Sequence, residues 1–231
     1  SQPLGSDSNS GTESSPFQTI NKAISESIPG TTILVMDGLY QNNNYGFGLN
    51  GTLLNNGPVI NFNKSGTNGF PITLKNLDGH FPKIQFDGAG GIKFTNGVNN
   101  VIIEGLEIEG PSGSINYEQA IADREYKISV AEDDDDNTSY NHTYFSGKGI
   151  WGYGPHNNII IRNNLVYNTP GSGIRFNDSD YITIENNTVY NTTWWTSSAS
   201  SAIVYAESIS AEGDNGSEVK MIMRGNIVYN N

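Results

Sequence analysis

Three segments near the C-terminal end share one pattern: IIIRNNLVYN at 159–168, ITIENNTVYN at 182–191 and MIMRGNIVYN at 221–230. A fourth segment, VIIEGLEIEG at 101–110, keeps the apolar residues and lacks the asparagines. Self-similar segments are typical of solenoids, in which each repeat buries its apolar face only by stacking on its neighbours. The sequence therefore predicts a stack of similar rungs that brings distant residues side by side.

Alternation along a strand assigns the residues of these repeats to the inside or the outside of the stack. Asn164, Asn187 and Asn226 occupy equivalent positions at an inward turn. We expect their amides to satisfy one another, because a buried amide without partners costs about 1–3 kcal/mol. Two outward columns follow, one of alternating charge and one of tyrosine: Glu104, Arg162, Glu185 and Arg224, then Tyr167, Tyr190 and Tyr229.

A second set of similar segments opens each rung: KGIWGYG at 148–154, SGIRFND at 172–178 and SAIVYAE at 201–207. Their isoleucines align as inward residues. Because the next residues along each strand then point outward, these segments predict an exposed floor of cations, aromatic rings and an amide. Its expected members are Lys93, Lys148, Trp151, Tyr153, Arg175 and Asn177.

The remaining chain predicts one irregular segment, one helix and several insertions. Residues 1–14 are polar and irregular, and residues 15–231 form the repeat domain. We expect a helix that starts with Ser15 as its N-cap and ends at Gly30, followed by a single strand over 31–40. Long insertions are expected at 111–147, 193–200 and 207–219. Since no capping segment follows Asn231, we expect further polypeptide or a second chain to complete the stack.

Composition excludes several classes of function. The formal net charge is −12, so a nucleic-acid partner would lack its usual electrostatic attraction. The chain has no cysteine, which excludes disulfides and thiolate metal sites. No stretch approaches the roughly 20 apolar residues of a membrane span. The predicted floor of aromatic rings and a few cations is instead suited to binding a sugar chain.

The arrangement resembles the right-handed parallel β-helix proteins, an all-β fold with an N-terminal capping α-helix. The likeness rests on the segment SPFQTINKAISESIPGTTILVMDGLY, the phrase PITLKN and the repeats IENNTVYN and RGNIVYN. Within that group the chain looks most like the secreted polysaccharide lyases that act on pectate, alginate or chondroitin. The resemblance implies a secreted, extracellular or periplasmic protein with a polysaccharide substrate, a lysine or arginine base and, in many members, calcium.

Elimination on a uronic acid needs a neutralised carboxylate, a base for the C5 proton and an acid for the departing oxygen. Arginine binds carboxylates through two parallel hydrogen bonds, so we assign Arg175 as the clamp and Lys148 as the base. Tyr153 or His156 is the candidate acid. The candidate residues for substrate binding are Trp151, Asn177, Trp194 and Trp195.

Calcium requires oxygen ligands, and the expected donors are Asp178, Asp180 and Glu207 on the edge opposite the insertions. The run of acidic residues at 132–136 is interpreted as a solvated loop instead. Two other functions remain open. A glycoside hydrolase would use Asp178 with Glu207, whose carboxyl groups would then lie about 5–10 Å apart. A non-catalytic carbohydrate-binding solenoid would show aromatic platforms without a basic residue in the groove.

Overall fold

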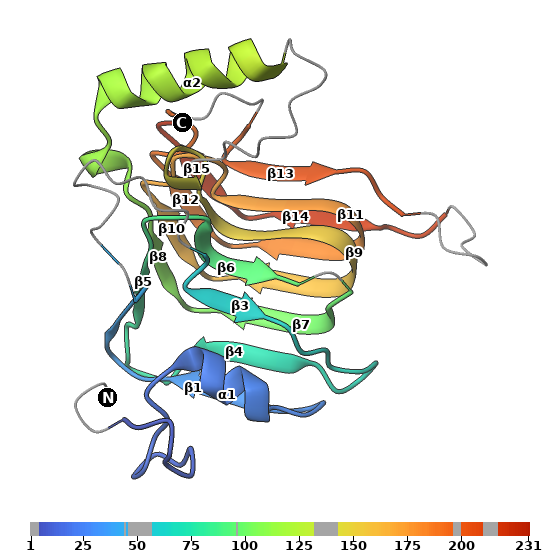
Figure 1. Ribbon diagram of the computed structural model, residues 1–231. Helices are drawn as coiled ribbons and strands as arrows, with labels where there is room; N and C mark the ends of the chain where they lie inside the picture. Colours follow the sequence, from blue (N-terminus) through green and yellow to red (C-terminus); the bar gives the residue numbers. More distant parts are fainter. Residues whose placement is uncertain are drawn as a thin grey trace.

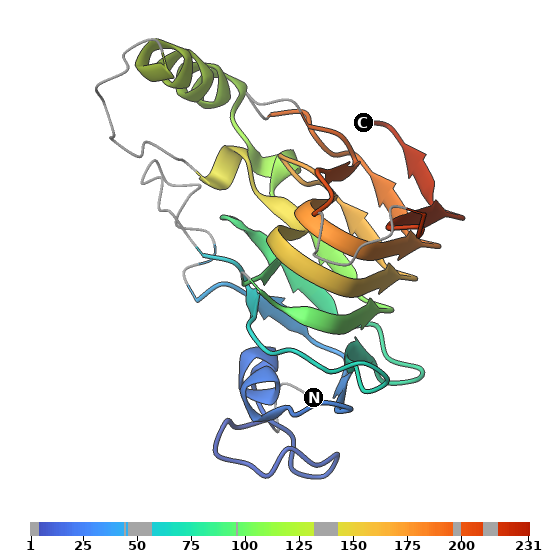
Figure 2. The ribbon, with the colours of Figure 1, turned by 90° about the vertical axis from the view of Figure 1, so that its right-hand side faces the viewer.

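The computed structural model describes residues 5–43, 45, 57–95, 97–131, 143–195, 200–209 and 217–231. The described part is mostly β-structure, with parallel sheets and few helices (Figure 1). The chain passes repeatedly through three columns of parallel strands, which we call faces A, B and C. Figure 2 shows the strands of successive passes stacked above one another.

Each face collects one strand, or one part of a long strand, from successive passes. Face A contains β3 (Ile60–Phe62), β6 (Gly90–Phe94), the first part of β9 (Lys148–Arg162), the first part of β11 (Ile174–Glu185) and β13 (Ile203–Ala206). Face B contains β1 (Thr32–Val35), β4 (Ile72–Asn76), β7 (Asn99–Glu104), the second parts of β9 and β11, and β14 (Met221–Arg224). Face C contains β2 (Leu39–Gln41), β5 (Lys83–Gln85), β8 (Glu107–Glu109), β10 (Leu165–Tyr167), β12 (Thr188–Tyr190) and β15 (Ile227–Tyr229).

The predicted asparagine ladder is present. The side-chain amide of Asn164 donates to Oδ1 of Asn187 at 3.0 Å, and that of Asn187 donates to Oδ1 of Asn226 at 3.0 Å. Each amide also donates to a backbone carbonyl, for example Asn187 to Ile161 at 2.9 Å and Asn226 to Ile184 at 2.8 Å. The ladder satisfies buried polar groups on three successive rungs and so holds their register.

The two predicted outward columns are also present. On face B, Arg162 contacts Glu104 at 2.9 Å and Arg224 contacts Glu185 at 2.7 Å. On face C, the rings of Tyr167, Tyr190 and Tyr229 stack with centroid separations of 5.0 and 4.9 Å. These separations match the strand spacing of about 4.8 Å, so identical side chains align directly above one another.

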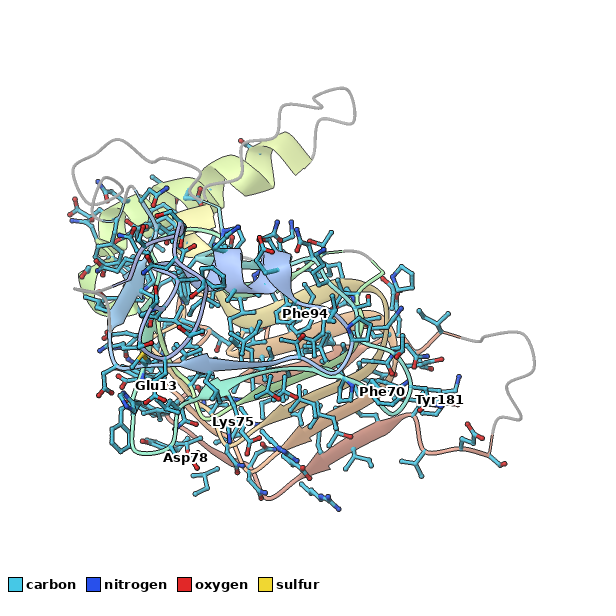
Figure 3. All side chains as sticks on the ribbon, turned by 90° about the horizontal axis from the view of Figure 1, so that it is seen from below. Glu13, Phe70, Lys75, Asp78, Phe94 and Tyr181 are labelled. Carbon is cyan, nitrogen blue, oxygen red and sulfur yellow. The ribbon has the colours of Figure 1, made fainter. Side chains whose placement is uncertain are left out.

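A column of phenylalanine rings fills the interior beside face A. Phe62 stacks on Phe94 at 5.5 Å, and Phe94 meets Phe176 at 5.4 Å, although one rung lies between them. That rung carries Gly152, and the imidazole of His156 occupies the space that a side chain there would need. Figure 3 shows Phe94 within the mass of side chains between the sheets.

Replacing Gly152 with alanine is expected to lower the free energy of unfolding by about 1–3 kcal/mol. The new Cβ would lie 2.5 Å from His156 Nε2 and 3.1 Å from Phe94 Cβ, so the buried rings would have to move. The measurement is urea denaturation followed by circular dichroism. Gly113→Ala is the matched control, because no atom lies within 4 Å of its added Cβ. Equal stability of both variants would contradict the steric argument.

The first helix starts later than the sequence indicated. Helix α1 spans Ile20–Glu26, and its N-cap is Thr19, whose hydroxyl accepts from the Lys22 N–H at 3.1 Å. The prediction of Ser15 as the N-cap was therefore wrong. The carboxylate of Asp7 accepts the Thr19 N–H at 2.8 Å and its hydroxyl at 2.9 Å. These two hydrogen bonds join Asp7 to Thr19, so the residues between them form a loop.

A further expectation about local structure was wrong. Residues 31–40 form two strands on different faces, β1 and β2, because the chain turns at Asp37 and Gly38. The insertion at 111–147 contains a helix, α2 (Tyr117–Ala131), between two short 3₁₀ turns, η3 (Ser112–Ser114) and η4 (Thr143–Phe145). Figure 1 shows α2 beyond the upper end of the strand stack. The acidic run at 132–136 lies outside the described residues.

The last described rung exposes side chains that are buried elsewhere in the stack. Met223 and Val228 are 46% and 48% exposed, whereas Ile184 and Val189 at the equivalent positions one rung earlier are fully buried. At the other end, Ile20 and Ile24 of α1 join the main core. Neither helix in the described part of the chain combines the length and apolar character that crossing a bilayer requires.

Candidate functional site

The predicted floor residues gather on the outer side of face A. Strand pairing places Lys93, Trp151 and Arg175 next to one another on three successive strands, and Tyr153 next to Asn177 in a neighbouring column. The Lys93 ammonium lies 5.0 Å from the centroid of the Trp151 ring. The structure therefore confirms that residues from three distant segments meet on one surface, which we call the cation–aromatic row.

The row alternates positive charges with aromatic rings. The Lys148 ammonium lies 5.4 Å from the Trp151 ring and 5.9 Å from the Tyr153 ring. The guanidinium of Arg175 lies 5.7 Å from the Tyr153 ring on the next strand. Contacts of this geometry attract a cation to the ring face by about 0.5–1 kcal/mol at an exposed site. The rings thus hold the cations in place without neutralising their charge.

Trp151 is the covered centre of the row. Its side chain points outward, as expected, but it is only 8% exposed because Lys93 and Lys148 lie against it and Tyr153 packs edge-on at 5.3 Å. Its indole Nε1 is buried without a hydrogen-bond partner. The expectation that Trp151 forms an open stacking platform for a sugar therefore does not fit this arrangement. Tyr153, which is 43% exposed, presents the accessible ring.

Arg175 and Lys148 are each held by a hydrogen bond. The Arg175 Nε–H donates to Oδ1 of Asn177 at 2.9 Å, which orients the guanidinium and leaves its two terminal nitrogens directed away from that bond. Lys148 Nζ donates to the carbonyl of Ser146 at 3.1 Å. Asn177 is therefore placed to position Arg175, a role that its predicted assignment to substrate binding did not include.

His156, the other candidate acid, lies in the interior and not on an exposed surface, which corrects its assignment to the site. Its side chain is 1% exposed and lies 5.8 Å from Phe94 and 6.1 Å from Phe176, centroid to centroid. Nδ1 lies 3.0 Å from the carbonyl of Val98, and since a carbonyl only accepts, Nδ1 carries the proton. Nε2 is buried without a partner. A group enclosed in this way cannot protonate a sugar on face A.

Burial lowers the pKa of His156 below 6.5, its ordinary value. The unfolded chain therefore binds this proton more readily than the folded chain, and stability should fall as the pH drops below about 6.5, by at most about 1.4 kcal/mol per pH unit. In His156→Asn, whose amide can still donate to Val98, that part of the pH dependence should disappear. Urea denaturation at pH 7.5 and 5.5 measures both slopes. The same slope in both proteins would assign the dependence to other groups.

The three predicted metal ligands do not form one donor set. Asp180 is 2% exposed, and its two oxygens accept from the Ile209 N–H at 2.9 Å and from Lys220 at 3.0 Å. Asp178 and Glu207 are exposed neighbours, and their hydrogen bond and mutual repulsion raise the pKa of Glu207. Within the described ranges, no group of three potential ligands is suited to a metal ion. Calcium binding at these residues is thus not supported by their contacts.

The tandem tryptophans have different environments. Trp195 packs beside a small second core formed by Ala120, Tyr144 and Phe145, and its ring lies 6.0 Å from Tyr117. Trp194 is 58% exposed. Trp195 therefore helps to anchor the insertion, while Trp194 remains available to a ligand. Tyr144 is 1% exposed and therefore belongs to this small core and not to a ligand-binding surface.

A pocket of about 290 Å³ lies at the other end of the molecule, between the N-terminal loop, α1 and β1. Its apolar walls include Phe17, Ile33 and Tyr40. It shares no residue with the cation–aromatic row, whose residues lie on a sheet face. The row is the stronger candidate because it combines exposed charge with an accessible ring, whereas the pocket lacks a cluster of reactive groups.

Comparison with known proteins identifies one family and a few relatives. A family model described as "Protein of unknown function (DUF1565)" matches residues 4–231. Uncharacterized protein YwoF of Bacillus subtilis (strain 168) is 26% identical over 126 residues, which make up 52% of this chain and 23% of that protein. The chain thus spans less than a quarter of the length of this relative.

Two solved structures are similar to this chain. The crystal structure of pectate lyase Pel9A has a TM-score of 0.55 and 18% identity, over 82% of this chain and 38% of that chain. A rhamnogalacturonan lyase has a TM-score of 0.46 and 12% identity, over 98% of this chain and 65% of that chain. At this identity the first likeness shows the fold alone, which is the parallel β-structure of Pel9A.

Proposed function

The chain belongs to the DUF1565 family of proteins of unknown function, and we propose that this chain is a secreted polysaccharide lyase. It would cleave an acidic, uronic-acid polysaccharide by β-elimination. The observation that carries the proposal is the cation–aromatic row, in which an accessible tyrosine lies between Lys148 and Arg175. The similarity of the fold to that of a pectate lyase supports the substrate class by analogy only.

The proposed chemistry assigns one role to each of three side chains. The terminal nitrogens of Arg175 would bind the C5 carboxylate and stabilise the negative charge that develops next to it. Lys148, in its neutral form, would take the C5 proton. The electrons of that C–H bond form the C4–C5 double bond while the C4–O bond breaks, and Tyr153 would donate its proton to the departing oxygen. Proton exchange with solvent then restores Tyr153 and Lys148.

The structure favours this reaction over hydrolysis at the expected carboxylate pair. A glycoside hydrolase needs two carboxyl groups about 5–10 Å apart, on either side of the bond to be cleaved. Asp178 and Glu207 instead interact directly, which raises the pKa of Glu207, so they lie closer together than that arrangement needs. Neither residue belongs to the cation–aromatic row.

The proposal extends to the architecture. We propose that the three faces close into a right-handed parallel β-helix, the hand that parallel crossovers adopt in nearly all proteins. Helix α1 would cap its N-terminal end, which is consistent with the burial of Ile20 and Ile24. A further rung, from additional polypeptide or a second chain, would bury Met223 and Val228.

Absorbance at about 235 nm tests the activity, because elimination creates an unsaturated uronide and hydrolysis does not. Purified protein should raise the absorbance of at least one of polygalacturonate, alginate or chondroitin. A neutral polymer such as cellulose serves as the control substrate. New reducing ends without an absorbance change would identify a hydrolase, and binding without either signal would identify a carbohydrate-binding solenoid. Either result would overturn the lyase proposal.

A further inference from the structure

The charges of face A differ from those of the other two faces. On face B, Arg162 and Arg224 each contact a glutamate of the neighbouring strand. On face C, Lys83 lies 2.7 Å from Glu109 and 3.3 Å from Glu107. The corresponding outward column of face A contains Asn61, Lys93, Trp151, Arg175 and Val204, and none of these is acidic. The column beside it contains Tyr153, Asn177 and Ala206.

Two of these cations are held apart at a defined spacing. Lys93 and Arg175 lie on the same column, separated by the strand that carries Trp151, so their backbones are about 10 Å apart at the usual strand spacing. The Trp151 ring holds the Lys93 ammonium, and Asn177 holds the Arg175 guanidinium. Two charges that are fixed in this way, without an acidic neighbour in their column, form a site for two anionic groups on one extended ligand.

We propose that this surface binds a run of adjacent uronate residues through Lys93 and Arg175 directly, without a bound calcium ion. The inference rests on the proposed function, because the Arg175 subsite is the one where elimination would occur. Arg175 would hold the carboxylate of the reacting sugar, and Lys93 the carboxylate of a sugar two strands away along the stack. The expected calcium donors support this view, because the two oxygens of Asp180 already accept hydrogen bonds from Ile209 and Lys220.

Calorimetric titration with a purified oligogalacturonate, in EDTA and separately in calcium chloride, tests the inference. We expect the same affinity within about twofold in both conditions. Lys93→Gln should weaken binding about fivefold, which corresponds to the loss of one partly exposed ionic contact. The matched control is Lys75→Gln, which removes the same charge from face B, where Lys75 contacts Asp78 at 3.4 Å (Figure 3). It should leave the affinity unchanged.

A second ligand separates charge recognition from general sugar binding. The methyl-esterified oligosaccharide has the same backbone without carboxylates, and we expect its affinity to be at least tenfold lower. Three results would each overturn the inference. Binding could require calcium, Lys93→Gln and Lys75→Gln could weaken binding equally, or the esterified ligand could bind with the same affinity.

The inference and the proposed function can fail separately. Calcium-dependent binding together with a rise in absorbance at 235 nm would refute the inference and keep the lyase. Binding that needs Lys93 and resists EDTA, without any absorbance change, would keep the inference and refute the lyase. An absence of binding to every uronate oligosaccharide would refute both.

Discussion

Replacing Asn187 with alanine is expected to lower the free energy of unfolding by about 3 kcal/mol. The side chain is fully buried, and its Oδ1 accepts from both the backbone N–H and the side-chain amide of Asn164, each at 3.0 Å. Its amide donates to Ile161 and to Asn226. Alanine would remove all four bonds, and the Asn164 N–H and the Ile161 carbonyl would lose their Asn187 partner in a buried region. Urea denaturation followed by circular dichroism measures the loss.

The neighbouring residue supplies the control for this prediction. Thr188 belongs to the same rung but points outward on face C, so Thr188→Ala should cost less than about 1 kcal/mol. If Asn187→Ala and Thr188→Ala had similar stability, the ladder would not contribute to the cohesion of the stack. The comparison is informative because the two replaced residues are adjacent in the chain. One replacement removes a buried side chain, and the other removes a side chain that points outward.

Replacing Arg175 with glutamine is expected to reduce kcat/KM on a uronate polymer by about 10²–10³-fold, with most of the loss in kcat. Glutamine keeps a polar side chain but removes the charge that would stabilise the developing carbanion. Arg175→Lys should recover part of the activity, since a lysine keeps the charge and loses both the forked geometry and the bond to Asn177. Initial rates of absorbance increase at 235 nm give both parameters.

Arg224→Gln is the matched control for Arg175→Gln. Arg224 occupies the outer side of face B on β14, which pairs with the second part of β11 and not with the part that carries Arg175, and its side chain is 69% exposed. Its replacement should leave kcat/KM unchanged. Loss of activity in both variants would point to the overall charge of the protein, and full activity in Arg175→Gln would remove that residue from the mechanism.

The sequence predicted the register of the stack well. Asn164, Asn187 and Asn226 form the expected ladder, and the tyrosine column lies where the repeats placed it. The same repeats brought Lys93 and Arg175 to one surface. These relations follow from repetition itself, because equivalent residues of stacked parallel strands become neighbours whatever the rest of the chain does.

The sequence predicted only part of the candidate site that the structure shows. The outward direction of Trp151 and Tyr153 follows from alternation, but the cover of lysine side chains over Trp151 depends on rotamers from two strands. The sequence placed Lys93 on the floor but gave no sign of its contact with the Trp151 ring, because the distance between them is not visible in either segment. Gly152 is visible in the sequence as a small residue in the inward column of Phe94 and Phe176. It could have indicated that another side chain enters the core there, because the space that a glycine leaves has to be filled.

The repeats alone establish the periodic part of the structure: which residues stack, which side of a strand each one occupies and which faces they share. The repeats gave no sign that phenylalanines enclose His156, that Lys220 binds Asp180 or that Asp7 accepts hydrogen bonds from Thr19, the N-cap of α1. The physical reason is that strand periodicity is a local property of the chain. Burial, ion pairing and capping instead depend on contacts between residues far apart in sequence, which no repeat encodes.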